Sequence, residues 1–136
     1  SGHRSTMVSA IQCIAELDAG DVYMKLPLQL DGSANEIFNR LDAVIEKMII
    51  EILNTNPRPT KQQGKVTLFK RKKPEESNLI YCKEGDINDW YNQIRMLDAE
   101  GYPNAFLEYN GMKLEFRRVV KNDQNLISEV RITPSI

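Results

Sequence analysis

The sequence has little of the residue types that build a metal site, a disulfide framework or a membrane span. Its single histidine, His3, excludes a multi-histidine metal centre, and we expect no bound metal. The two cysteines, Cys13 and Cys82, are far apart and fit neither a CxxC pair nor a disulfide framework, which predicts free thiols in a reducing, cytoplasmic compartment. The longest apolar run, AVIEKMIIEIL, is interrupted by charges and falls short of the ~18 residues that cross a bilayer, so we expect no membrane partner.

The chain also lacks an excess of charge of either sign. Its formal net charge is -1, so contact with nucleic acid would need a local basic patch. With 136 residues and 41% hydrophobic content, it can form one domain or two small lobes with a real core. Its composition does not suggest disorder.

The first thirty residues predict a hairpin-like pair of strands. Residues 6–15 read as a mostly buried strand, and VYMKLPLQL reads as a second strand in which Pro27 suits an edge or a strand end. The intervening LDAGD has turn chemistry, with Asp18 at the bend and Gly20 free to take a positive φ.

A capped helix is expected to follow. Ser33 and Glu36 form a capping box, and Pro57 stops the helix near residues 53–56. One buried apolar face is predicted from the helical spacing of Ile37, Leu41, Val44, Ile45, Met48, Ile49 and Ile52.

The second half of the chain predicts a helix and a small antiparallel sheet. A linker at NPRPTKQQGK is followed by a short strand, VTLF, and by the basic residues 70–73. Asp86 caps a helix over residues 87–99, which Gly101 ends. Asn110-Gly111 suits a type I′ turn between alternating strands, and LISEVRIT supplies a third strand.

Four segments taken together, ELDAGDVY, GSANEIF, FKRKKPEES and IRMLDAEGYPNAF, resemble formyltransferases that use N10-formyltetrahydrofolate. The family includes methionyl-tRNA and amino-sugar enzymes. The resemblance implies the C-terminal part of a Rossmann-like formyltransferase domain, followed by a helix and a short antiparallel three-stranded sheet. It places the C-terminal half of the catalytic domain in residues 1–60, and a linker, helix and small subdomain in residues 61–136.

The resemblance implies that Asp18 is a catalytic carboxylate. In the family an aspartate in an LDxGD turn orients a histidine and helps to move protons. An Asn-x-His pair contacts the formyl oxygen, which becomes an oxyanion during formyl transfer. The backbone of Glu16, Leu17 and Asp18 would line the pterin pocket. By turn chemistry alone, Asp18 would be a structural residue that bonds its own backbone.

The Asn-x-His pair is absent from these 136 residues. Ser1, not Asn, stands two residues before His3, so we interpret His3 as a solvated loop residue. We therefore expect the fragment alone to be inactive, with the missing N-terminal half of the catalytic domain as a partner. Homo-oligomerisation is a second way to cover its apolar strands.

The basic stretch is either a solvated loop or an acceptor contact. Its sequence resembles an RRxPExS signature of sugar-type enzymes, which implies phosphate contacts by Arg71 and Lys72, and Tyr102 would shape the acceptor cleft. Arg95 is interpreted as a structural cation that pairs with Asp98 or Glu100.

We therefore expect a formyltransferase that acts on an amino sugar, such as a nucleotide-linked amino sugar, or on another small amine. One alternative is methionyl-tRNA formyltransferase, for which Lys61, Lys65 and residues 70–73 could contact the phosphates of an initiator tRNA. The other is a noncatalytic binding domain that keeps the scaffold.

Overall fold

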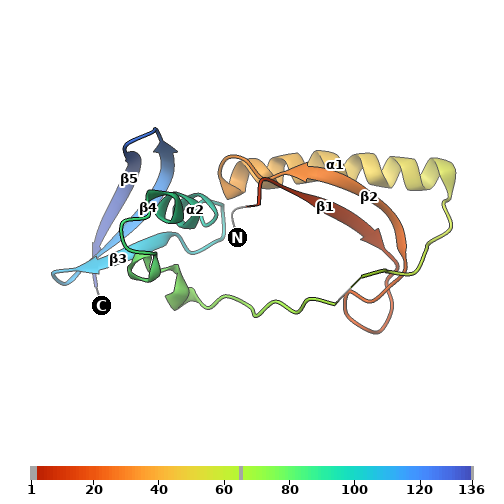
Figure 1. The fold of residues 1–136 in the computed structure, drawn as a ribbon, viewed down its shortest axis with the longest axis horizontal. Helices are drawn as coiled ribbons and strands as arrows, with labels where there is room; N and C mark the ends of the chain where they lie inside the picture. The colour runs from red at the N-terminus through yellow and green to blue at the C-terminus, as the bar shows by residue number, and fades with distance from the viewer. Residues whose placement is uncertain (1–2, 65, 136) are drawn as a thin grey trace. The chain divides into compact units, whose positions relative to one another are not determined.

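The computed structural model describes residues 3–64 and 66–135 and divides the chain into two compact units. The first unit comprises residues 1–31 and 37–69, and the second comprises residues 32–36 and 70–136. The mixed α/β class predicted from the sequence, with a helix followed by a three-stranded antiparallel sheet, is confirmed (Figure 1). Lys65, one of the predicted basic contacts, lies outside the described residues.

A two-stranded antiparallel sheet forms the first part of the first unit. Strands β1 (Ser5–Ile11) and β2 (Val22–Gln29) pair from Ser5↔Gln29 to Ile11↔Val22, with an irregularity after Ala10. Both predicted strands are present, but β1 ends four residues earlier than expected. The prediction that β1 is mostly buried is wrong, because a two-stranded sheet leaves an open edge and Met7 is 52% exposed.

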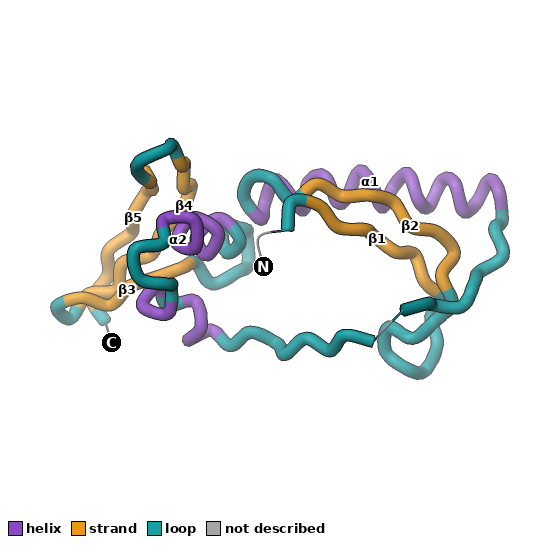
Figure 2. The backbone as a smooth tube through the Cα atoms, viewed as in Figure 1, coloured by secondary structure: helices purple, strands orange, loops and turns teal. Residues whose placement is uncertain are grey.

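Helix α1 (Ala34–Thr55) begins with the predicted capping box. The Ser33 N–H donates to Glu36 Oε2 at 2.7 Å, and the Glu36 N–H donates to Ser33 Oγ at 3.3 Å. At the other end Asn56 takes a positive φ of 42°, and its N–H donates to Ile52 O at 2.9 Å. Figure 2 shows α1 as one uninterrupted helix.

The apolar face of α1 is wider than the hairpin can cover. Ile37 and Met48 are buried, at 6% and 3% exposure. Ile45 and Ile49, predicted to lie in the same buried face, are 40% and 53% exposed, so that part of the prediction is wrong. The helical period places them beside the buried residues, but a sheet of two strands is too narrow to cover both rows.

The linker after α1 contacts the hairpin through its backbone. The Val22 N–H donates to Thr60 O at 2.8 Å, and the Thr60 N–H donates to Val22 O at 2.9 Å. The strand predicted for VTLF does not form: residues 66–69 are irregular, and Leu68 and Phe69 are 91% and 88% exposed. Alternating apolar residues need a neighbouring strand to form a ladder, and no partner strand occurs among the described residues.

The second unit contains the predicted three-stranded sheet. Strands β3 (Ala105–Tyr109), β4 (Met112–Lys121) and β5 (Leu126–Pro134) pair antiparallel in the order β3-β4-β5. Asn110 and Gly111 have φ angles of 49° and 73°, as a type I′ turn requires, so the hairpin prediction is confirmed.

One helix and two short 3-10 helices pack on this sheet. Helix α2 (Ile87–Arg95) is capped by Asp86, whose carboxylate accepts from the N–H groups of Asn88 and Asp89 at 2.9 and 3.3 Å. It ends four residues before the predicted residue 99. The 3-10 helices, Pro74–Ser77 and Leu79–Tyr81, were not predicted. The core of the unit is formed by the buried residues Leu79, Ile94 and Ala105.

Two neighbouring positions of α1 provide a stability test. We expect Met48→Ala to lower the free energy of unfolding by ~2–5 kcal/mol, because it opens a cavity at a buried site. The matched control, Ile49→Ala, removes an exposed side chain and should cost less than about 1 kcal/mol. Urea titrations of the two variants would measure the difference. Equal losses would contradict the described packing of α1.

Candidate functional site

The loop between β1 and β2 holds Asp18 in a tightly folded turn. The Gln12 N–H donates to Asp21 O at 2.8 Å, which closes the loop over residues 12–21. Asp18 itself takes the left-handed conformation, with φ 56°, which aspartate tolerates better than most residues. The predicted positive φ at Gly20 is not found. Gly20 is required for another reason: a Cβ there would lie 1.9 Å from Gln12 O.

A glutamine from the linker holds this turn from outside. The side-chain amide of Gln62 donates to Asp18 O at 2.7 Å and to Gly20 O at 2.8 Å. Both bonds come from Nε2, so one amide group fixes two carbonyls on either side of Ala19. This contact was not predicted, because Gln62 is one of two adjacent glutamines in a segment with no structural pattern.

The predicted cofactor-binding residues lie on the exposed part of the same turn. Glu16, Leu17 and Asp18 are all exposed, and Leu17 reaches 88%. The structure thus brings these three residues together and leaves their side chains open to a ligand. His3 is exposed, and Ser1 lies outside the described residues.

The basic stretch is anchored in the second unit through Lys72. Its ammonium donates to Gln93 Oε1 at 2.9 Å, and Gln93 Nε2 donates to Glu76 O at 2.8 Å. Partial burial lowers the pKa of Lys72 from its usual value, while the nearby Glu76, Cys82 and Asp89 act in the opposite direction. Arg71 is exposed. Of the two predicted phosphate contacts, Lys72 is therefore hydrogen-bonded to a residue of α2, whereas Arg71 is exposed at the surface.

Cys82 is a half-buried free thiol in the same neighbourhood. Burial raises the pKa of the thiol above its usual value, Asp89 raises it further, and Lys72 partly offsets both. A raised pKa keeps the sulfur in its protonated, unreactive form near neutral pH. Cys82 is therefore not suited to act as a nucleophile.

Arg95 has structural partners within the second unit. Its Nη1 donates to Gly32 O at 2.7 Å and its Nε donates to Asn92 Oδ1 at 2.9 Å, while its guanidinium lies 5.6 Å from the centre of the Tyr91 ring. Asp98, one of the two partners predicted for Arg95, accepts from the Arg118 N–H at 2.7 Å. Tyr102, predicted to shape an acceptor cleft, is 52% exposed in the turn before β3.

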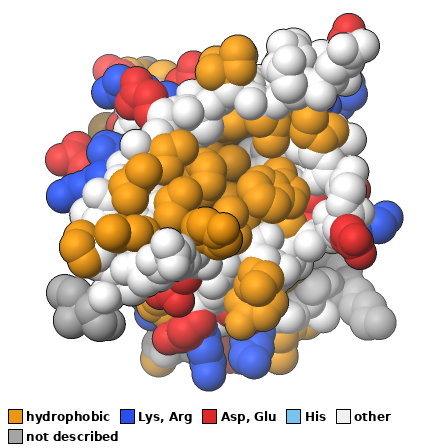
Figure 3. Space-filling model, turned by 90° about the vertical axis from the view of Figure 1, so that its left-hand side faces the viewer, with side chains coloured by type: hydrophobic (Ala, Val, Ile, Leu, Met, Phe, Trp, Pro, Cys, Tyr) orange, Lys and Arg blue, Asp and Glu red, His pale blue; other side chains and the backbone are white. Residues whose placement is uncertain are grey.

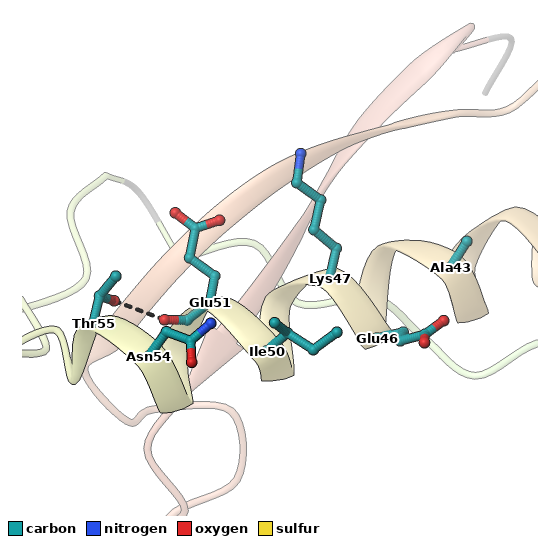
Figure 4. Close-up of a pocket in the computed structure, with 7 residues that line it drawn as sticks. All are labelled: Ala43, Glu46, Lys47, Ile50, Glu51, Asn54 and Thr55. Carbon is teal, nitrogen blue, oxygen red and sulfur yellow. Dashed lines mark hydrogen bonds between the residues drawn. The ribbon is translucent and has the colours of Figure 1, made fainter.

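One cavity of the first unit lies away from Asp18, along α1. It measures about 550 Å³ and is an open groove along α1, lined by Ala43, Glu46, Lys47, Ile50, Glu51, Asn54 and Thr55 (Figure 4). All seven residues belong to one helix, and Thr55 Oγ1 donates to the backbone Glu51 O at 2.8 Å. A groove with one wall encloses no reacting group, so we do not interpret it as a catalytic site.

Two further features bear on the class of protein. Among the described residues, no group of three or more His, Cys, Asp or Glu side chains is arranged to hold a metal ion. No helix in that part of the chain is both long and apolar enough to cross a bilayer.

The sequence is similar to methionyl-tRNA formyltransferases. Residues 74–133 match the family described as methionyl-tRNA formyltransferase, C-terminal domain. The methionyl-tRNA formyltransferases of Bacillus velezensis and Bacillus pumilus are 28% and 27% identical to the chain over 121 residues. Each match covers 84% of this chain and 37% of the relative, so the chain spans little more than a third of the length of these curated relatives.

Solved structures show the same relationship. The methionyl-tRNA formyltransferase from Clostridium thermocellum is 41% identical, with a TM-score of 0.91 over 98% of this chain and 58% of that one. HypX from Aquifex aeolicus, in complex with tetrahydrofolic acid, shares the fold at 16% identity and a TM-score of 0.65, over 90% of this chain and 22% of HypX. The chain is therefore similar to formyltransferases, and its second half matches their C-terminal domain.

The contact of Gln62 with the Asp18 turn can be tested directly. We expect Gln62→Ala to speed amide hydrogen exchange in residues 16–21 by roughly 5-fold or more, because two hydrogen bonds worth ~0.5–1.5 kcal/mol each are lost. The neighbouring Gln63→Ala, at an exposed position, is the matched control and should leave the exchange unchanged. Unaltered exchange in Gln62→Ala would show that the turn is held by its own backbone alone.

Proposed function

We propose that this chain is the C-terminal part of an enzyme that moves a formyl group from N10-formyltetrahydrofolate to the amino group of methionyl-tRNA. The observation that carries the proposal is the 41% identity to the Clostridium thermocellum enzyme along 98% of the chain, which includes the Asp18 turn. The names of the matched relatives support a tRNA acceptor over the amino sugar expected from the sequence. A cytoplasmic location remains a prediction.

Asp18 is the residue we assign to the chemistry. Formyl transfer to an amine requires that a proton leave the attacking nitrogen and that a proton reach the departing one. A carboxylate at an exposed, hydrogen-bonded turn can orient a histidine and pass such a proton. In this proposal the histidine and asparagine come from other parts of the enzyme, so residues 1–136 by themselves are inactive.

The exposed backbone around Asp18 fits the folate donor. Glu16 and Leu17 are exposed residues, and in this proposal their backbone polar groups bond the polar edge of a pterin ring. The Leu17 side chain, 88% exposed, offers an apolar contact for the face of the ring. The donor supplies the formyl group, and these residues would hold its ring.

The first unit is proposed to be half of a catalytic domain. Residues 1–60 leave an open edge along β1 and an uncovered row on α1 that includes Ile45, Ile49 and Leu53, the last 78% exposed. A soluble domain normally buries such a row. Further strands of the enzyme, pairing with β1 and packing on α1, would cover it.

A small amine acceptor remains the second candidate, because of one observation. The C-terminal sheet has three strands within the described residues, whereas a closed five-stranded barrel of the kind that binds oligonucleotides needs more. A nucleotide-linked amino sugar would need only a phosphate contact from Arg71 and an aromatic contact from Tyr102. If neither acceptor is formylated, the noncatalytic alternative stands.

Replacement of Asp18 tests the assignment of the reaction. In the full-length enzyme we expect Asp18→Asn to lower kcat/KM for formyl transfer by ~10²-fold or more, because the amide keeps the shape of the turn but cannot move a proton. The control Asp42→Asn, exposed on α1, should retain full activity. Formyl transfer measured with labelled donor would show the loss. A decrease below about tenfold would refute the catalytic role of Asp18.

The basic stretch distinguishes the two acceptors. If tRNA is the acceptor, Lys70→Glu/Arg71→Glu should weaken its binding by roughly tenfold or more and flatten the dependence of log K on log salt, because phosphate contacts release counterions. Lys83→Glu, an exposed charge elsewhere in the second unit, is the control. Formylation of an amino sugar with a shallow salt dependence would refute the tRNA acceptor and leave the formyltransferase assignment intact.

A further inference from the structure

The Asp18 turn is exposed, yet the structure shows what holds it in place. It differs in this from the apolar surface of the second unit, where hydrophobic side chains lie uncovered on the side that Figure 3 shows. The Gln12 N–H closes the loop by donating to Asp21 O, and the Gln62 amide bonds the turn from the linker. Among the described residues, Gln62 provides the only side-chain hydrogen bonds to the backbone of residues 16–21.

The backbone of the linker sets where Gln62 stands. Thr60 exchanges two backbone hydrogen bonds with Val22, the first residue of β2, and Thr60 Oγ1 donates to Val22 O at 3.5 Å. Gln62 follows two residues later, which is the spacing at which side chains of an extended chain point to the same side. The pairing at Thr60 therefore directs the Gln62 side chain toward the hairpin loop, where the amide reaches both carbonyls.

The amide group of Gln62 fixes two peptide planes of the turn. Its Nε2 carries two hydrogens, one for Asp18 O at 2.7 Å and one for Gly20 O at 2.8 Å. Because a peptide unit is planar, fixing a carbonyl also fixes the N–H on the other side of the same plane, here those of Ala19 and Asp21. The plane after Asp18 sets the ψ angle of that residue, and together with its φ of 56° this determines the direction of the Cα–Cβ bond.

The Asp18 carboxylate is not held by a contact of its own. Within residues 3–64 and 66–135, its oxygens take part in no hydrogen bond or ion pair. A left-handed backbone at a residue other than glycine persists only where the surroundings impose it. The position of the carboxylate is thus set through the backbone of the turn, and Gln62 is the side chain that holds this backbone.

We propose that Gln62 is a positioning residue for formyl transfer, which acts through Asp18 and does not itself exchange a proton. The inference rests on the proposed function, in which the Asp18 carboxylate orients a histidine and passes a proton. Such a group is effective only within hydrogen-bond reach of its partner, and a displacement of about 1 Å can cost ~10²-fold in rate. An amide suits this task because it donates two hydrogen bonds and carries no charge.

The first test separates kcat from KM in the full-length enzyme. Gln62→Ala should lower kcat about tenfold while the KM for each substrate stays within about twofold, because the variant still binds donor and acceptor but misplaces the carboxylate. Gln62→Glu should lose as much, since an ionised carboxylate of the same size has no hydrogen to donate. Gln63→Ala, at the exposed neighbouring position, is the matched control and should retain full kcat.

Two kinetic results would contradict the role of Gln62. The first is a kcat of Gln62→Ala within about twofold of the wild type. The second is a raised KM at unchanged kcat, because the side chain would then bind a substrate and not position the carboxylate.

A double variant distinguishes positioning from general destabilisation. If Gln62 acts only through the Asp18 carboxylate, Asp18→Asn/Gln62→Ala should have the same kcat as Asp18→Asn, within about twofold. A role in folding or in binding would lower the activity of Asp18→Asn further, by the factor measured for Gln62→Ala alone, and that additive result would overturn the proposal. Full activity of Asp18→Asn would refute the proposed chemistry as well. A large loss in Asp18→Asn with none in Gln62→Ala would refute only the role of Gln62.

A measurement without substrates tests the contact itself. In the full-length protein, the NMR order parameters of the Ala19 and Asp21 amides should fall from about 0.85 to below about 0.6 in Gln62→Ala, because both peptide planes lose a hydrogen bond. Gln62→Glu, which keeps the size of the side chain, should show the same decrease and serves if Gln62→Ala does not fold; Gln63→Ala should not show it. Circular dichroism would confirm the fold of each variant. Unchanged order parameters in a folded Gln62 variant would overturn the proposal.

Discussion

A sheet of two or three strands persists in water only when its apolar face is covered, and within the described part of the chain each sheet has a single α-helix to cover it. In the first unit α1 buries Met48 and leaves Ile49 exposed. In the second unit α2 covers the Ala105 end and leaves Ile132 exposed. Both units therefore leave apolar side chains exposed for the same reason: one helix is too narrow to cover the whole face.

The site at Asp18 depends on close backbone packing. A side chain at position 20 would collide with the carbonyl of Gln12, so only glycine lets the loop close. Gln62 then fixes the carbonyls of Asp18 and Gly20 from the linker. The linker is thus part of the site, which explains how a loop with exposed side chains can hold a carboxylate in one place. A catalytic group gains from such positioning because the geometry is set before the substrate binds.

The features predicted correctly from the sequence are those that neighbouring residues decide. The Ser33 capping box, the Asp86 cap and the Asn110-Gly111 turn each depend on hydrogen bonds or φ angles within a few residues. The resemblance to formyltransferases also relied on short ordered motifs, and the comparisons support that resemblance. The preference for a small amine acceptor rested on the basic stretch and on the few strands expected after Gly111, and the relatives favour the tRNA alternative.

The sequence by itself thus determined the two α-helices, the Asn110-Gly111 hairpin and the resemblance to formyltransferases, because these follow from local chemistry and motif order. Only the tertiary structure decided which apolar residues are buried and which residue holds the Asp18 turn. VTLF has the alternation of a strand but finds no partner strand among the described residues, and Ile49 has the helical period of a core residue but no surface above it. Gln62 lies 44 residues from Asp18 in the chain, and nothing local to either residue indicates their contact. The burial of a residue and its long-range hydrogen bonds depend on the segments that the fold places next to it. A sequence pattern indicates only which surroundings that residue would suit.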